Sequence, residues 1–222
     1  MMKNSMLLWA IAMGMMVSAC SNNGTEATTG EAEKVEVVEE TSATTTLSTV
    51  KEGSAVAWRA SHLGGVQPRN GSVMLKEATV LVEGSTLKNA SVLMDIAGLK
   101  VENFPEGSDE NAKLTGHLLS GDFFNVEKFP TAKFELTNLA AAEGDYNSTV
   151  TGNLTILDAT KSITFKANVN ASDSEVSIQS EDFSVDRTNW GLSYNTEGTA
   201  GVPVDYLIAN DIGFTINVTV TK

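Results

Sequence analysis

Alternation of apolar and polar residues dominates the chain after residue 46. In the stretch SITFKANVN, Ile163 and Phe165 fall on one side of an extended chain, and Thr164 and Lys166 fall on the other. The same period of two recurs in STVTGNLTI, TAKFEL and DIGFTINVTVTK. A period of two is typical of β-strands with one buried and one wet face, and the spacing predicts roughly eight or nine strands, joined mostly as hairpins.

One segment, SDENAKLTGHLLS, departs from the alternation and predicts a short helix. Ser108 stands where an N-cap is expected, and Asp109 and Glu110 occupy the first turn, where negative charge is favourable. Leu114 and Leu118 are four residues apart, which places them on one face of the helix. The chain is therefore expected to be all-β with one short helix.

This element content leaves three architectures open. A sandwich packs two apolar faces together, a closed soluble barrel turns them inward, and an outer-membrane barrel turns them outward to lipid. The aromatic content of 6% and the final residues VTVTK, which hold no aromatic girdle, argue against the outer-membrane barrel. Alternation alone does not separate a sandwich from a soluble barrel.

The first residues are typical of an export signal. Lys3 supplies a positive charge, and the apolar run MLLWAIAMGMMV that follows is shorter than the roughly 20 residues that span a bilayer. The run ends in VSAC, and small residues before a cysteine at this point resemble a bacterial lipobox. We therefore expect residues 1–19 to be a lipoprotein signal peptide and Cys20 to be the lipidated first residue of the mature chain.

Two consequences follow for the rest of the chain. Cys20 is the only cysteine, so the domain folds without an internal disulfide. Residues 20–46 are rich in Thr, Ala and Glu and contain no aromatic residue, which predicts a disordered acidic tether that holds the domain away from the membrane.

The charge balance and the missing motifs narrow the function. The formal net charge is −13 and the 15 basic residues are scattered, which excludes a typical nucleic-acid surface. The two histidines, His62 and His117, show no metal-binding spacing, and no cysteine supports them. Neither a GxSxG motif nor a glycine-rich phosphate loop is present. We therefore expect no metal, no catalytic residues and no enzyme activity.

Four stretches identify a family resemblance. They are SAVAWRASHLGG near the start of the domain, HLLSGDFFNVEKFPTAKFEL, VTGNLTILDATKSITFKANV and FSVDRTNWGLSY. In this order and spacing they resemble the YceI-like family of exported bacterial proteins, and the resemblance covers residues 47–222. One departure is Asp158 in LTILDATK, where the family usually carries glycine; aspartate also suits tight turns.

The resemblance implies an eight-stranded antiparallel barrel similar to a lipocalin, with one short helix. Family members enclose an apolar tunnel that holds a polyisoprenoid, such as a polyprenyl phosphate or a quinone tail, or another long-chain lipid. They are carriers or sequesters of such lipids, are often linked to stress, and are not enzymes. Apart from this lipid no cofactor is implied. The expected location is the cell envelope, with the anchor in the outer membrane facing the periplasm or the cell surface.

The alternation and the resemblance together give a set of expected site residues. The expected tunnel lining is Trp58, Phe123, Phe124, Phe134, Val150, Leu154, Ile156, Ile163, Phe165, Trp190, Phe214 and Ile216. Without the resemblance, Trp58 and Trp190 would be expected to fill the core. His117 and Arg187 are the expected contacts for a lipid head group. For His117 the alternative is a polar contact near the helix end or a position on the surface, and for Arg187 it is an ion pair with Asp182, Asp186 or Asp205. If the DFF segment is extended, Phe123 and Phe124 point to opposite sides.

A second function is compatible with the same residues. If the apolar side chains fill the barrel completely, the chain is a structural or adhesion module on a lipid anchor. A continuous internal cavity separates the two cases, because only a lipid carrier needs one. The sequence leaves open which lipid is bound and whether the domain forms a homodimer.

Overall fold

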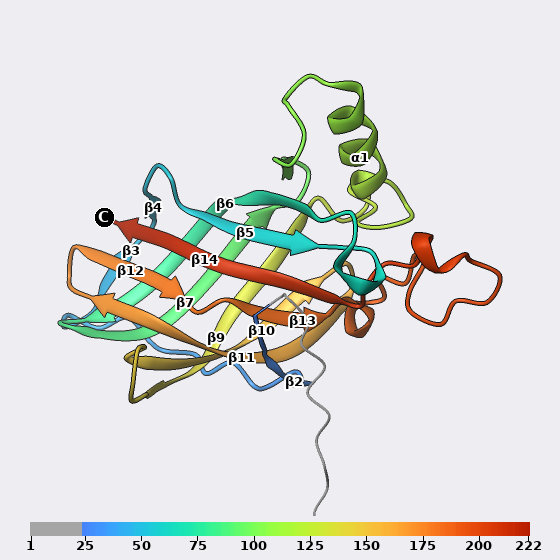
Figure 1. The fold of residues 1–222 in the computed structure, drawn as a ribbon. Coiled ribbons are helices and arrows are strands. Elements are labelled where there is room, and N and C mark those ends of the chain that lie inside the picture. Colours follow the sequence, from blue (N-terminus) through green and yellow to red (C-terminus); the bar gives the residue numbers. More distant parts are fainter. Residues whose placement is uncertain (1–23) are drawn as a thin grey trace, which may run out of the picture.

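The computed structural model describes residues 24–222, so the expected signal peptide and Cys20 lie outside the described residues. Figure 1 shows mostly strands, with one α-helix at one end. No helix within residues 24–222 is long and apolar enough to cross a membrane. The strands are β1 (Thr25–Glu26), β2 (Thr28–Glu31), β3 (Thr45–Leu47), β4 (Thr49–Val50), β5 (Ala55–Ala60), β6 (Arg69–Glu83), β7 (Thr86–Asp95), β8 (Lys100–Val101), β9 (Thr131–Ala141), β10 (Ser148–Ile156), β11 (Ala159–Ala171), β12 (Glu175–Ser180), β13 (Phe183–Asp186) and β14 (Asp211–Thr221).

Eight of these strands close into an antiparallel barrel, as the sequence predicted. The neighbours run in the order β5, β6, β7, β9, β10, β11, β12 and β14. Pairing of β14 with β5 closes the ring, with Phe214 opposite Trp58. Closure places every second side chain of each strand inside one interior, which is why the alternation in the sequence is so regular.

Shifts in the strand register change which residues face inward. In β9 the register shifts where it pairs with β10, so Leu136 and Leu139 both face the interior although they are three residues apart. In β6 the register against β7 shifts between Leu75 and Glu77. Inward positions are therefore Val73 and Leu75 before the shift and even-numbered residues after it, as expected of a β-bulge.

The two ends of the barrel differ. At one end the core is solid, because Leu47, Val82, Val176 and Val220 are fully or almost fully buried and pack together with the rest of the apolar core. The other end carries α1 (Asp109–Leu119), the short 3-10 helices η1 (Leu63–Gly65), η2 (Arg187–Trp190) and η3 (Val204–Tyr206), and the loops beside them (Figure 1). We call this second end the mouth.

The helix α1 begins as the sequence predicted. The side chain of Ser108 accepts a hydrogen bond from the amide of Asn111, and two acidic residues fill the first turn. The side chain of Asn111 donates to the carbonyls of Val101 and Phe104, at 2.8 and 3.1 Å, which fixes the helix to the end of β8 and its loop. After the helix and its turns, β9 begins at Thr131, directly after Pro130.

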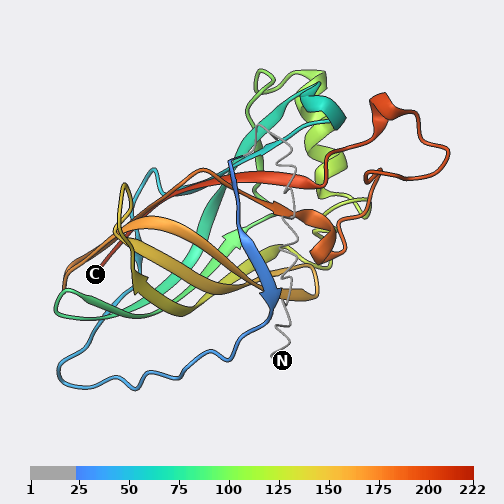
Figure 2. The ribbon, with the colours of Figure 1, turned by 60° about the horizontal axis from the view of Figure 1, so that its bottom comes forward.

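A segment expected to be part of the tether instead completes the barrel wall. β13 pairs with β14 on one side and with β1 on the other, and the first half of β11 pairs with β10 and with β2. Residues 25–31 therefore lie between β13 and β11, where these two strands do not pair with each other. Residues 32–44 then run outside the barrel towards β3 (Figure 2). We call residues 24–33 the strap.

The strap is held mainly through its backbone. The amides of Thr25 and Ala27 donate to the carbonyls of Asp182 and Ser184, at 2.9 and 2.8 Å. The buried side chain of Asn153 accepts from the amide of Glu33 at 2.8 Å and donates to its carbonyl at 2.7 Å. The expectation of disorder therefore does not hold for residues 24–33, because strand pairing satisfies their backbone groups without requiring apolar side chains.

Like charge opposes the docking of the strap. Burial raises the pKa of Asp211, and the nearby carboxylates of Glu26, Asp186 and Glu197 raise it further. A carboxyl whose pKa is raised on folding makes the folded state less stable as the pH rises through its ordinary range. The strap, which supplies Glu26, is therefore expected to dock more firmly when the carboxyl of Asp211 is protonated than when it is charged.

We expect Asn153→Ala to loosen the strap without loosening the barrel. Two hydrogen bonds to Glu33 are lost, so amide hydrogen exchange in the strap should accelerate by about tenfold or more. Asn138→Ala is the matched control, because Asn138 is an exposed asparagine on β9. Equal acceleration of the strap and of β6 and β7 would show that strap and barrel open only together.

Candidate functional site

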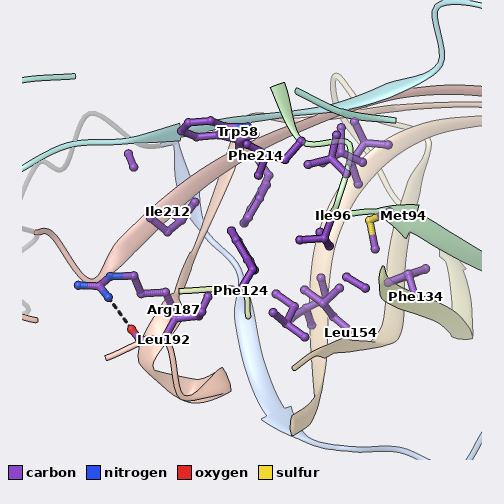
Figure 3. Close-up of a pocket in the computed structure, with 18 of the residues that line it drawn as sticks. Trp58, Met94, Ile96, Phe124, Phe134, Leu154, Arg187, Leu192, Ile212 and Phe214 are labelled. Atoms are coloured by element: carbon purple, nitrogen blue, oxygen red, sulfur yellow. Dashed lines mark hydrogen bonds between the residues drawn. The ribbon is translucent and has the colours of Figure 1, made fainter. Parts of the chain in front are cut away.

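A cavity of about 460 Å³ occupies the barrel between the solid end and the mouth. Figure 3 shows side chains from several strands pointing into it, among them Trp58, Met94, Leu154 and Phe214. Almost all of its lining is apolar, because the inward faces of the strands carry aliphatic and aromatic residues. No aspartate or glutamate lines it.

The predicted lining residues lie around this cavity with one exception. The following all line it: Trp58, Phe123, Phe124, Phe134, Val150, Leu154, Ile156, Ile163, Phe165, Phe214 and Ile216. Four of the phenylalanines form a continuous series across β9, β11, β13 and β14. Ring centroids are 6.2 Å apart for Phe134 and Phe165, and 4.6 Å for the stacked pair Phe165 and Phe183.

Trp190 is the exception, because it is buried in the wall and does not line the cavity. Its indole Nε1–H donates to the carbonyl of Leu154 at 2.9 Å, which ties η2 to β10. An aromatic residue on a short 3-10 helix carries no alternation signal, so its sequence position did not reveal which way it points.

Other lining residues were missed by the sequence interpretation. They come largely from β6, β7 and the segments around them: Val73, Leu75, Leu87, Ala90, Val92, Met94, Ile96 and Leu99. In the stretches GSVML and SVLMDI the apolar residues are consecutive, so alternation did not assign their faces. Leu192 and Tyr194 come from the loop after η2, where no periodic signal exists.

An aromatic cluster lies over the cavity at the mouth. The ring of His117, from the last turn of α1, meets Phe123 and Tyr194 edge to face, with centroids 5.0 and 4.8 Å away. Nε2 of His117 lies 3.1 Å from Oδ2 of Asp122. The DFF segment is a series of turns, so the condition under which Phe123 and Phe124 would point to opposite sides is not met; both residues line the cavity.

Arg187 lines the cavity, but its guanidinium donates hydrogen bonds to backbone carbonyls of the protein. Its Nε donates to the carbonyl of Ala209 at 3.1 Å, and Nη1 donates to that of Leu192 at 2.5 Å (Figure 3). Nη2 donates to the carbonyls of Tyr194 and Ile208, at 3.0 and 3.3 Å. The guanidinium thereby connects the two sides of the long loop between η2 and β14.

In contrast to the alternative that the sequence left open, no carboxylate among residues 24–222 forms an ion pair with Arg187. Its side chain is buried, and burial lowers its pKa, although the charges of Asp186 and Glu197 act in the opposite direction. Asp182, one of the expected partners, forms its ion pair with Arg59 instead. The carbonyls around Arg187 supply partial negative charge in place of a carboxylate.

The polar groups near the cavity gather at the mouth. His62, Gln67, Arg69 and Asn195 line it there, together with His117. Arg69 stacks on the ring of Phe104, with its guanidinium carbon 5.2 Å from the ring centroid. Within residues 24–222 no group of three or more His, Cys, Asp or Glu side chains is arranged to hold a metal ion. What this arrangement can do is enclose an apolar chain and place a polar end at the mouth.

Fold and cavity together define a class of protein: a closed antiparallel barrel that encloses an apolar cavity. The model of the YceI-like domain matches residues 47–220, and the chain belongs to that family. A UPF0312 protein of Pseudomonas putida is 33% identical over 122 residues, which cover 54% of this chain and 59% of that protein. A UPF0312 protein of Pseudomonas aeruginosa is 51% identical over 57 residues, or 26% of this chain and 29% of that protein. The chain therefore spans less than two thirds of either relative.

Two solved structures share the fold at low sequence identity. A polyisoprenoid binding domain from Saccharophagus degradans, implicated in plant cell wall breakdown, has a TM-score of 0.55 and 13% identity, and covers 79% of this chain and 98% of that one. BcnA of Burkholderia cenocepacia has a TM-score of 0.51 and 16% identity, and covers 76% of this chain and 96% of that one. At these identities the likeness establishes the fold alone.

We expect Arg187→Met to lower stability because it leaves four loop carbonyls without their donor. Each unsatisfied buried group costs about 1–3 kcal/mol, so the unfolding free energy should fall by at least about 2 kcal/mol. For a chain of this size that lowers Tm by about 4–8 °C. Thermal unfolding measures the change.

Arg59→Met is the control, because it removes a partly exposed arginine whose ion pair is worth about 0–1 kcal/mol. An unchanged Tm in Arg187→Met, together with a selective loss of affinity for polyprenyl phosphate relative to polyprenol, would instead identify Arg187 as a head-group contact.

Proposed function

We propose that this protein binds a long-chain lipid of the polyisoprenoid class in its barrel, and carries or sequesters it in the cell envelope without catalysing a reaction. The observation that carries the proposal is the continuous apolar cavity. Membership of the YceI-like family supports it, as does the shared fold with a polyisoprenoid binding domain. The aromatic cluster at His117 and the polar groups at the mouth are the proposed surroundings of the lipid's polar end.

The energetics of the cavity favour a ligand over a filled structural module. An empty cavity in a protein core costs about 24 cal/mol per Å³. For about 460 Å³ that amounts to roughly 11 kcal/mol, which is comparable with the entire stability of a typical domain. Water is a poor occupant, because an apolar cavity offers it few hydrogen-bonding partners. A flexible hydrocarbon chain both fills the space and gains roughly 25 cal/mol per Å² of apolar area.

We further propose that Cys20 carries a lipid anchor, for which the small residues before it are the support. The strap then changes the expected geometry of attachment. Gly24 is four positions after Cys20, and an extended chain reaches about 3.3–3.6 Å per residue. The anchor would therefore lie within about 14 Å of the barrel wall. This arrangement holds the barrel at the membrane surface, in contrast to a long tether.

We expect protein purified from a Gram-negative host to contain an isoprenoid or another long-chain lipid. Native mass spectrometry would show the bound mass, and extraction into organic solvent followed by mass spectrometry would identify it. Protein that is free of lipid and also fails to bind added polyprenyl lipids would contradict the proposal.

We expect Ala132→Phe to reduce lipid binding while preserving the fold. Ala132 is buried and lines the cavity, so a phenyl ring there occupies space that the ligand needs. The Kd for a fluorescent polyprenol should rise by about tenfold or more. Tm should stay unchanged or rise, because filling a void commonly stabilises a protein. Ala140→Phe places the same ring on the exposed side of β9 and should leave the Kd unchanged.

A further inference from the structure

Exposed apolar side chains gather on two loops at the mouth. Val66, just after η1, is 49% exposed, and Val204 and Tyr206 in η3 are 67% and 64% exposed. Folded proteins normally bury such residues or expose them singly, and a group of them beside a binding cavity commonly marks an interaction site. We call residues 63–68 and 202–208 the rim.

The two rim loops are joined to each other, so their apolar residues form one surface. His62 and Ile208 form a β-bridge, and the amide of Leu63 donates to the carbonyl of Leu207 at 3.0 Å. Nδ1 of His62 lies 2.5 Å from the carbonyl oxygen of Asp205. The tips of η1 and η3 are therefore held beside each other at the same end of the barrel (Figure 1).

The rim is continuous with the cavity. Gln67, Tyr206 and Ile208 line the cavity, and Gln67 and Tyr206 are also exposed to solvent. An apolar ligand that leaves through the mouth therefore passes directly along the rim. If the rim faced water, the ligand would expose its hydrocarbon during every transfer, which is strongly unfavourable.

The charges on the rim indicate which partner fits it. Residues 63–68 carry no charged side chain, and residues 202–208 carry one, Asp205. A surface that binds anionic lipid through its charge needs clustered Lys and Arg, which are missing from these loops. The whole chain also has a formal net charge of −13, so an anionic membrane would repel it.

We propose that the rim docks on a neutral lipid bilayer, with Val66, Val204 and Tyr206 entering the interfacial layer, so that lipid passes between membrane and cavity without crossing water. The inference rests on the proposed lipid-binding function. A bilayer fits better than a protein partner or a second copy of this chain, because either would cover the mouth without supplying the ligand. Tyrosine, here the exposed Tyr206, is also a residue typical of membrane interfaces.

Depth of insertion provides a direct test on the full chain. Vesicles of brominated phosphatidylcholine should quench the fluorescence of the tryptophan introduced in Val204→Trp. They should not quench that of the tryptophan introduced in Val37→Trp. Val37 is the matched control, since it is a valine that is 92% exposed on the loop between β2 and β3. Adding phosphatidylglycerol to the vesicles should weaken the quenching of Val204→Trp at low salt.

Lipid uptake separates this inference from the proposed function. Val66→Ser combined with Val204→Ser should slow the transfer of a fluorescent polyprenol from phosphatidylcholine vesicles by about tenfold. Its Kd for the same probe added from dilute solution should be unchanged, because neither valine lines the cavity. Val37→Ser should behave as the unmodified protein.

The outcomes are distinguishable. If the fluorescence of Val204→Trp is not quenched although the protein binds the fluorescent polyprenol, the docking is overturned and the lipid-binding function stands. If the fluorescence of Val204→Trp is quenched but the protein does not bind the fluorescent polyprenol, the docking is supported and the proposed lipid-binding function is contradicted. A blue shift of Val204→Trp with rising protein concentration and no vesicles would identify a second copy as the partner, and would also overturn the docking.

Discussion

Closure of the sheet between β14 and β5 directs every second side chain of eight strands into one interior. That geometry makes the inward faces apolar, and it also fixes how much space they must fill. The side chains at one end fill it, whereas those near the mouth leave about 460 Å³. The cavity is therefore a property of the barrel as a whole, and not of a cluster of polar residues.

Where strands alternate regularly, the sequence predicted the strands and which of their side chains face the interior, whereas the closed barrel was implied by the family resemblance. Val150, Leu154 and Ile156 on β10 were predicted to line the interior and do so, because a strand with one wet face has only one way to orient them. The prediction stopped where periodicity stops. Leu139 follows a register shift that only the pairing with β10 reveals, and Trp190 lies on a 3-10 helix that turns its ring into the wall.

The strap was missed for a different physical reason. Its only apolar residues are Ala27 and Ala32, and composition is a measure of what side chains can bury. Addition of a strand to a sheet instead satisfies backbone groups, and nearly any residue can supply them. Asn153 gave no signal either, because it lies on the outer face of β10, where a polar residue is expected; in the structure its side chain is buried and binds the backbone of Glu33. A buried polar side chain needs a partner, and here the partner was a segment 120 residues away in the sequence.

A hollow barrel also explains why polar contacts hold the mouth. A filled core would fix the surrounding loops by packing, but the interior beneath the mouth is hollow. The long loop after η2 is fixed instead by the guanidinium of Arg187, which binds four of its carbonyls, and the seam between β11 and β13 is closed by backbone pairing of the strap. Hydrogen bonds depend on direction, so they can hold walls in place around a space that stays free for a ligand. An apolar residue at position 187 would have filled that space without fixing the loop.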